Sequence, residues 1–352
     1  MDRIGYTVET VLLEGSMDRL WFMHSNESSS VPLSENRRSS SWRGPRAPDR
    51  GRPLLSVKDL LWFLYLYPLR LLASRLSSID LYRIGRAVEP IFQSVTRRQR
   101  REVSQRMALA FGSRSSSNSN LATTRRFVSN AIRRVLDDLT ISHPKASPRL
   151  APPEVHGLDH LEKALATGKG AILTSGHFYA NRLAKHHLAK MGYPIMSVRD
   201  GQPPDEWMGR FGARFLQRRY IEFLHGIIRE EVFVQDRECS LKIFRRLRAG
   251  GIVNVHIDAN LSEQYVEIPF LGQPERFATG LLEIVRLSGC AVVPMLCLGN
   301  QEASSITFGE PAALTPSRSR EEFAQVNLPR LVRILEEHIL EHPDQWELWV
   351  RL

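Results

Sequence analysis

One histidine at the end of an apolar segment is the residue of this sequence best placed to do chemistry. His177 follows the run Gly170-Ala171-Ile172-Leu173-Thr174-Ser175-Gly176, which has the length and composition of a buried strand. Ligands of open α/β sheets bind at the carboxyl ends of strands. An imidazole at such a place can act as a general base, because its ordinary pKa is about 6.5. A structural histidine is the alternative that position alone leaves open.

Further polar side chains stand at comparable places. Asp258 ends a second apolar segment and Arg199 follows a third. Arg199 could bind a phosphate of a substrate, although a plain surface position is an equal alternative. Asn181 comes four residues after His177, so the two would share one face of a helix. Thr279 begins a predicted helix, whose free N–H groups could hold an anion.

Short apolar strands alternate with helices after residue 150. The predicted strands are 171–174, 195–198, 252–257 and 291–298, and the predicted helices are 158–166, 181–191, 206–219, 240–249, 280–287 and 321–341. This alternation is typical of an α/β fold with a mostly parallel sheet flanked by helices. It would place His177 and Asp258 at the same edge of the sheet.

The first 150 residues have a different character. Residues 1–53 are rich in Ser, Pro, Gly and Arg, and we expect a disordered leader there. Residues 54–150 are predicted to be helical and membrane-associating, and 151–352 to form the α/β domain. The apolar run Leu60–Tyr67 is shorter than the span of about 20 residues that crosses a bilayer, and Pro68 and Arg70 interrupt its continuation. A buried core helix is the alternative for this run.

Composition limits the possible partners. The 352 residues carry a net charge of +10, with 41 Arg against 7 Lys. Nucleic acid, an anionic membrane surface and an acidic carrier protein all fit that charge. We expect no nucleic acid, since no recognition motif is present. The three cysteines form no CxxC pair and the histidines have no zinc spacing, so we expect neither a metal nor another cofactor.

Several segments, taken in order over roughly residues 60–352, resemble the lipid A biosynthesis (lauroyl/myristoyl) acyltransferases. That family lies within the lysophospholipid-acyltransferase-like superfamily. The similar segments are Gly168 to Phe178, Gly251 to Asp258, Val266 to Pro274, Ala278-Thr279-Gly280, Gly289 to Pro294 and His342-Pro343-Asp344-Gln345-Trp346. No single segment is decisive, but their order and spacing together are specific.

The resemblance implies transfer of a fatty acyl chain to a hydroxyl of a lipid or glycolipid, with a lipid A-type acceptor. The donor would be a thioester of acyl carrier protein or coenzyme A, and His177 would be the general base. It also implies action at the cytoplasmic face of the bacterial inner membrane, by peripheral binding or a single N-terminal anchor. The turn containing Phe270 and Gly272 would lie beside the acyl site, and Thr279 would bind substrate.

The sequence departs from the family's pattern where an acid is expected. The position five residues after the histidine carries Arg182, which has no acceptor to orient the imidazole. Asn181 or Asp258 could take over that role. Alternatively, Arg182 binds a substrate phosphate, or it is a surface residue pointing away from the site. The chain could also be a catalytically degenerate relative that binds lipid or carrier protein.

Overall fold

The computed structural model describes residues 53–112, 117–143, 150–199, 208–227, 230–259, 262, 264–300 and 303–351. The predicted leader therefore lies outside the described residues, except for residue 53. Residues 144–149, directly before the described start of the α/β region, also lie outside the described residues.

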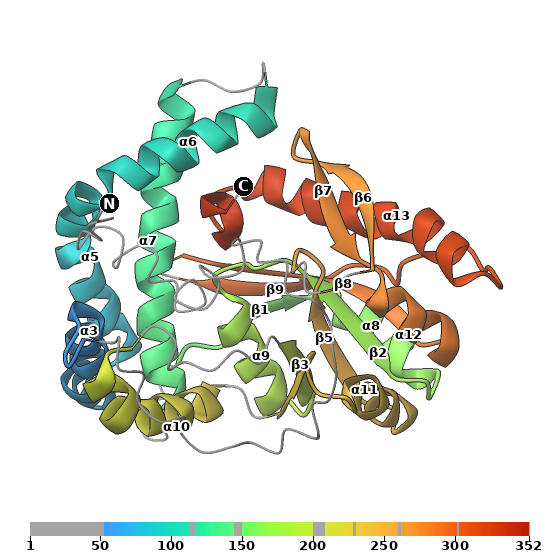
Figure 1. The fold of residues 1–352 in the computed structure, drawn as a ribbon, viewed down its shortest axis with the longest axis horizontal. Helices are drawn as coiled ribbons and strands as arrows, with labels where there is room; N and C mark the ends of the chain where they lie inside the picture. Colours follow the sequence, from blue (N-terminus) through green and yellow to red (C-terminus); the bar gives the residue numbers. More distant parts are fainter. Residues whose placement is uncertain are drawn as a thin grey trace.

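A seven-stranded sheet in the order β1-β9-β8-β2-β5-β3-β4 forms the centre of the molecule (Figure 1). Its strands are β1 Glu154–His156, β2 Ala171–Ser175, β3 Ile195–Arg199, β4 Glu230–Phe233, β5 Ile252–His256, β8 Ala291–Gly299 and β9 Ser304–Phe308. Strands β8, β2, β5, β3 and β4 run parallel to one another. Strand β9 is antiparallel to β8, and β1 pairs parallel with β9. The predicted mostly parallel sheet is confirmed. The short strands β1, β4 and β9 are additions to the predicted set.

Helices cover both faces of the sheet, as expected for continuous apolar strands. Helices α8 (Leu158–Ala166) and α9 (Asn181–Lys190) share one apolar cluster with alternate β2 residues, Ala171 and Leu173. The residue between them, Ile172, packs on the other side, where the helices are α11 (Cys239–Arg248), α12 (Gly280–Ser288) and α13 (Arg320–Glu341). The two-residue period of the strand thus divides β2 between two cores.

The described part of the N-terminal region, predicted to be helical over residues 54–150, consists of helices. It comprises α3 (Val57–Leu64), the π-helical turn η1 (Tyr65–Leu69), α4 (Arg70–Arg75), α5 (Ser78–Val95), α6 (Arg97–Phe111) and α7 (Ser117–Ile141). Figure 1 shows α7 standing beside the sheet, with α3 and α5 on its outer side. The π-helical turn contains Pro68, so the chain stays helical through the proline instead of stopping there.

The run around Trp62 is both a core helix and an exposed apolar surface. Trp62, Tyr65 and Leu66 are buried against the helical segment formed by η5 (Gly212–Leu216) and α10 (Gln217–Ile227). The ring of Trp62 meets Tyr220 edge-on at 4.7 Å. Other large apolar side chains of the same run face solvent, among them Phe63. Among the described helices, none is long and apolar enough to cross a bilayer.

The predicted tight turn joins a hairpin that the sequence patterns do not indicate. Strands β6 (Tyr265–Phe270) and β7 (Gln273–Ala278) pair antiparallel through the two residues Leu271 and Gly272. Both have positive φ, 50° and 82°, as a tight two-residue hairpin turn requires. The Leu271 N–H donates to Glu336 of α13 at 2.6 Å, which holds a bulky residue in a backbone region it rarely adopts. The chain ends in the short helix η6 (Glu347–Val350).

Two glycines before β2 provide a matched test of this architecture. Gly170 has φ 70°, and a Cβ there would lie 2.6 Å from the Gly251 oxygen, whereas Gly168 has φ 72° and open space around it. We expect Gly168→Ala to lower the free energy of unfolding by about 1 kcal/mol through backbone strain alone. Gly170→Ala should lower it by more than about 2 kcal/mol, because a backbone clash adds to that strain. Urea denaturation of the two variants measures the difference, and equal losses would contradict it.

Candidate active site

Two strand ends bring His177 and Asp258 together. Strands β2 and β5 are neighbours in which Ser175 lies opposite His256, so His177 and Asp258 each follow two residues beyond a matched pair. The Nδ1 atom of His177 lies 2.7 Å from Oδ1 of Asp258, and the His177 backbone N–H donates to Oδ2 at 2.7 Å. Because a carboxylate only accepts, Nδ1 carries the proton and Nε2 is left as the basic nitrogen.

The C-terminal segment fixes both members of this pair. The indole N–H of Trp346 donates to Oδ2 of Asp258 at 2.8 Å, and the backbone N–H of Glu347 donates to the carbonyl oxygen of His177 at 2.8 Å. Phe178 and Trp346 also pair as an antiparallel bridge. Residues far apart in sequence thus hold the ring and the carboxylate in one orientation.

The electrostatics of Asp258 favour its charged form. Burial by itself raises the pKa of this carboxyl, but the charge and hydrogen bond of His177, together with His256 and the indole N–H of Trp346, outweigh that effect. The pKa falls from 3.8 to about 2. Asp258 is therefore a carboxylate at neutral pH, able to stabilise an imidazolium beside it.

His256 stacks against His177 with ring centroids 4.5 Å apart. Its Nδ1 lies 3.0 Å from the carbonyl oxygen of Gly176, and a carbonyl only accepts, so this nitrogen is the protonated one. Burial, then the nearby charges of His177 and Lys185, hold the pKa of His256 well below its ordinary range. His256 is thus an uncharged residue that lines the site beside the imidazole ring of His177.

His177, His256 and Asp258 also form a group whose possible ligand atoms lie within 4.8 Å of one another, close enough for a shared cation. Oδ1 of Asp258, however, is bound to the His177 ring, and its Oδ2 accepts two further N–H groups. A cation would have to displace these hydrogen bonds. The arrangement suits proton transfer better than metal ligation.

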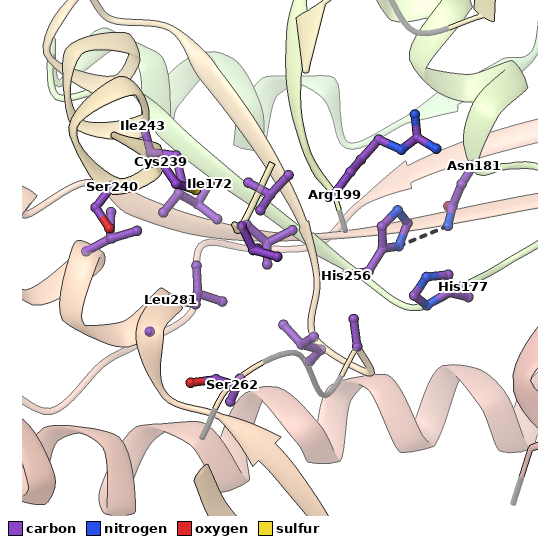
Figure 2. A pocket seen from close by; sticks show the side chains of 18 of the residues that line it. Ile172, His177, Asn181, Arg199, Cys239, Ser240, Ile243, His256, Ser262 and Leu281 are labelled. Atoms are coloured by element: carbon purple, nitrogen blue, oxygen red, sulfur yellow. Dashed lines mark hydrogen bonds between the residues drawn. The ribbon is translucent and has the colours of Figure 1, made fainter. Parts of the chain in front are cut away.

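A cavity of about 400 Å³ opens next to this pair. Figure 2 shows its two ends: His177, His256, Asn181 and Arg199 lie at one, while Ile172, Ile243 and Leu281 lie toward the other. Its apolar lining comes from β2, β3, β5, α11 and α12, that is, from the centre of the sheet and the helices on one face. The cavity therefore joins a basic nitrogen to a volume that suits a hydrocarbon chain.

The structure corrects the expectations for Arg182 and Asn181. Arg182 is a buried residue of the cavity lining, not a surface arginine, and its Nη1 lies 2.7 Å from Oδ2 of Asp138 on α7. Asn181 does not contact the His177 ring through a hydrogen bond that would orient it: its Nδ2 donates to the Gly176 oxygen, and its buried Oδ1 has no hydrogen-bond partner among the described residues. The acceptor for the ring is Asp258.

The remaining candidates fall into two groups. Arg199 lines the cavity and pairs with Glu231 of β4 at 2.7 Å. Phe270 is not among the residues that line the cavity, but its ring meets that of Trp346 edge-on at 5.9 Å. Gly272, at the tip of the hairpin, and Thr279, before α12, are not among the residues that line the cavity. The structure therefore brings His177, Asn181, Arg182, Arg199 and Asp258 to one place. Gly272 is not part of the cavity lining, and Thr279 lies between two residues that are, Ala278 and Gly280.

Three residues of the site have no catalytic role in the sequence-based predictions. Trp346 and His256 occur there only within segments that resemble the family, the C-terminal one and the one ending at Asp258. Lys185, which lines the cavity, belongs to no pattern. The one sequence signal for His256 is alternation. It stands two residues before Asp258 along the same extended segment, so both side chains point to one face.

Fold and site together define an α/β protein with a hydrogen-bonded histidine–carboxylate pair at the carboxyl ends of neighbouring parallel strands, beside an apolar cavity. The model of the bacterial lipid A biosynthesis acyltransferase family matches residues 54–351. The chain belongs to this family, as its sequence motifs predicted.

Two curated relatives are phosphatidylinositol mannoside acyltransferases of Mycobacterium tuberculosis, from strains ATCC 25618 / H37Rv and CDC 1551 / Oshkosh. Each is 26% identical over 219 residues, which are 59% of this chain and 62% of the relative. The match thus spans less than two thirds of the length of either relative.

The low pKa of Asp258 predicts a specific acid dependence of stability. A carboxyl whose pKa is lower in the folded state stabilises the fold above its ordinary pKa of 3.8 and loses that contribution as pH falls toward 2. The contribution is about 2 kcal/mol. Asp258→Asn lacks this titration, so its stability deficit relative to the unmodified protein should shrink between about pH 4 and pH 2.

Urea denaturation at a series of pH values measures this deficit. Trp346→Phe removes one of the N–H donors of Asp258 and keeps an aromatic ring, so it should show an intermediate pH dependence. A deficit of Asp258→Asn that stays constant across the acid range would contradict the assignment.

Proposed function

We propose that this protein is a membrane-associated O-acyltransferase that moves a fatty acyl chain from a thioester to a hydroxyl of a lipid or glycolipid. The observation that carries the proposal is the 2.7 Å hydrogen bond between His177 and Asp258 at the polar end of an apolar cavity. Family membership supports the same reaction class.

The reaction follows from the basic nitrogen. Nε2 of His177 takes the proton of the acceptor hydroxyl while the oxygen attacks the thioester carbonyl carbon. Asp258, bound to the other nitrogen, stabilises the imidazolium that forms. The tetrahedral intermediate then expels the thiolate, which receives the proton from Nε2. One C–O bond forms, one C–S bond breaks, and the products are an ester and a free thiol.

The cavity supports a fatty chain as the transferred group. Its inner lining is mostly aliphatic, with Ile172, Val255, Ile257, Leu281 and Ile284 among the residues. Asn181 lines the polar end of the cavity, and its Oδ1 has no hydrogen-bond partner among the described residues, so a substrate O–H is proposed to donate to it. Asn181 therefore stays in the proposal as a group that binds substrate, in place of its predicted role toward His177.

Arg199 and Arg182 are proposed to bind charged parts of the substrates. Both line the polar end of the cavity, and each already pairs with a carboxylate, Glu231 or Asp138. The planar fork of a guanidinium suits bidentate contact with a phosphate of the donor or acceptor. The donor is a thioester of acyl carrier protein or coenzyme A.

The acceptor is proposed to be a glycolipid hydroxyl. The relatives named for phosphatidylinositol mannoside make a mannosylated phosphoinositide the first acceptor to test, with a lipid A-type glycolipid as the second. Both present sugar hydroxyls next to acyl chains at a membrane surface.

A catalytically degenerate lipid-binding relative is the competing hypothesis. It depends on the absence of an acid five residues after His177. Asp258 supplies a carboxylate at hydrogen-bond distance from another strand, so the missing acid no longer favours loss of activity.

Substitution of the pair tests the proposal directly. With a radiolabelled acyl thioester and detergent-dispersed glycolipid, His177→Ala should abolish transfer above background. Asp258→Asn should lower kcat by about 10²–10⁴-fold with little change in acceptor KM, because the base loses its orienting partner but the cavity is unaltered. His156→Ala, an exposed histidine at the β1 edge, is the matched control and should keep full activity. Undiminished transfer by His177→Ala would refute the mechanism.

The proposed membrane surface is the exposed apolar side of α3, η1 and α4, together with the neighbouring helical segment. Its large side chains are Leu60, Phe63, Leu64, Tyr67, Leu69, Leu71, Leu72, Phe211 and Phe215. Arg218, with an 89% exposed side chain, and Arg219 lie on the adjoining α10. Large apolar side chains bordered by arginine suit the interface of an anionic bilayer, and this supports peripheral binding at the cytoplasmic face of the bacterial inner membrane.

Phe63→Glu combined with Phe215→Glu tests this surface. The double variant should bind lipid vesicles at least about tenfold more weakly, because two charged side chains replace two rings that the unmodified protein would bury in the bilayer. Leu241→Glu with Leu287→Glu, exposed residues of α11 and α12, carries the same charge change on a different face. Sedimentation with vesicles compares them, and equal weakening in both double variants would remove the assignment.

A further inference from the structure

A second hollow, of about 450 Å³, lies between α5, α6 and α7, in the helical layer beside the sheet. None of its lining residues belongs to the cavity beside His177. The residues that line it are Arg86, Glu89, Pro90, Gln93, Ser94, Arg97, Arg100 and Arg125. Four guanidinium groups thus face one carboxylate, an excess of positive charge for which the acyl-transfer chemistry has no use.

The polar groups of this hollow are incompletely satisfied within the protein. Glu89 accepts from Gln93 Nε2 at 3.1 Å and from Ser129 Oγ at 2.6 Å. Arg100 donates from Nη2 to the Gln93 carbonyl at 2.7 Å, but its buried Nε has no hydrogen-bond partner among the described residues. Burial, then the charges of Arg125, Arg97 and Arg101, lowers the pKa of Arg100. These cations are crowded, and a bound anion would relieve their repulsion.

The surroundings of the hollow indicate what kind of anion would reach it. Ile84 and Ile91 on α5 are exposed, and Ile91 directly follows Pro90 of the lining. Ile79, at the start of the same helix, is exposed as well and follows α4, which carries part of the proposed membrane surface. Arginines on the same helix as exposed aliphatic residues suit a phosphate at the level of lipid headgroups.

We propose that the hollow of Arg86, Arg97, Arg100 and Arg125 binds the phosphate of an anionic phospholipid headgroup. This site rests on the proposed membrane association and adds a specific polar contact to its apolar surface. It would fix the orientation of the enzyme on the bilayer, because apolar side chains at α3 and η1 and a phosphate contact at α5 and α6 define two separate points.

The test uses the full chain and vesicles of phosphatidylcholine, alone or with phosphatidylglycerol. The hollow variant carries Arg97→Gln, Arg100→Gln and Arg125→Gln. Its matched control carries Arg245→Gln, Arg248→Gln and Arg333→Gln, exposed arginines of α11 and α13 with the same loss of charge. We expect the hollow variant to bind the anionic vesicles at least about tenfold more weakly and the control less than about threefold. Both should bind pure phosphatidylcholine vesicles like the unmodified protein.

A second arm identifies the source of the phosphate. Glycerophosphoglycerol, the soluble headgroup, should compete for the anionic vesicles more strongly than inorganic phosphate at equal concentration. Competition as strong by inorganic phosphate would overturn the headgroup site in favour of a free-phosphate site. Equal losses in the two triple variants would overturn it in favour of a diffuse charge effect.

Acyl-transfer activity toward a detergent-dispersed acceptor does not require membrane binding, so measuring it tests the proposed headgroup site separately from the proposed enzyme activity. The hollow variant should retain that activity. If it instead lost transfer only from an acyl-carrier-protein donor and still bound vesicles, the hollow would be a site for an acidic protein, and the lipid site would be overturned. Thermal unfolding checks that the triple variant is folded. Arg125→Gln alone, at an exposed position, should show a smaller loss of vesicle binding in the same direction, and no loss would count against the site.

Discussion

The hydrogen bond between His177 and Asp258 is the interaction on which the rest of the site depends. It requires neighbouring parallel strands in a fixed register, because a shift by one residue would turn one side chain to the opposite face of the sheet. The pairing of β2 with β5, with Ser175 opposite His256, provides that register. The helices on both faces keep the two strands buried.

Buried charge pairs connect this site to the helical layer. Arg182, at the position where the family's pattern has an acid, pairs with Asp138 of α7, and Arg134 of the same helix pairs with Glu347 beside the site. Removing one member of such a pair leaves an uncompensated buried charge, which typically costs about 3–5 kcal/mol. We therefore interpret the substitution at position 182 as an exchange: the arginine ties α9 to α7, and the carboxylate that orients the histidine comes from β5.

The sequence predicted some strands and site residues well and missed others. The strands 171–174 and 195–198 agree with the observed ones to within one residue, because unbroken apolar runs between helices have few alternatives. Strands β1, β4 and β9 are short and partly exposed, so they lack that signal. Within the site, Asp258 is one of two candidates for the orienting group, and nothing local to the sequence decides between an amide on the following helix and a carboxylate on another strand.

The sequence by itself determined the family, the α/β class and the position of the basic histidine, because these depend on local patterns and on the order of motifs along the chain. The tertiary structure decided which groups surround that histidine: Asp258 lies 81 residues from His177, and Trp346 lies 88 residues from Asp258. It also decided that the apolar run near Trp62 is buried on one side and exposed on the other. Contacts over such separations arise from strand register and helix packing, which no local pattern encodes.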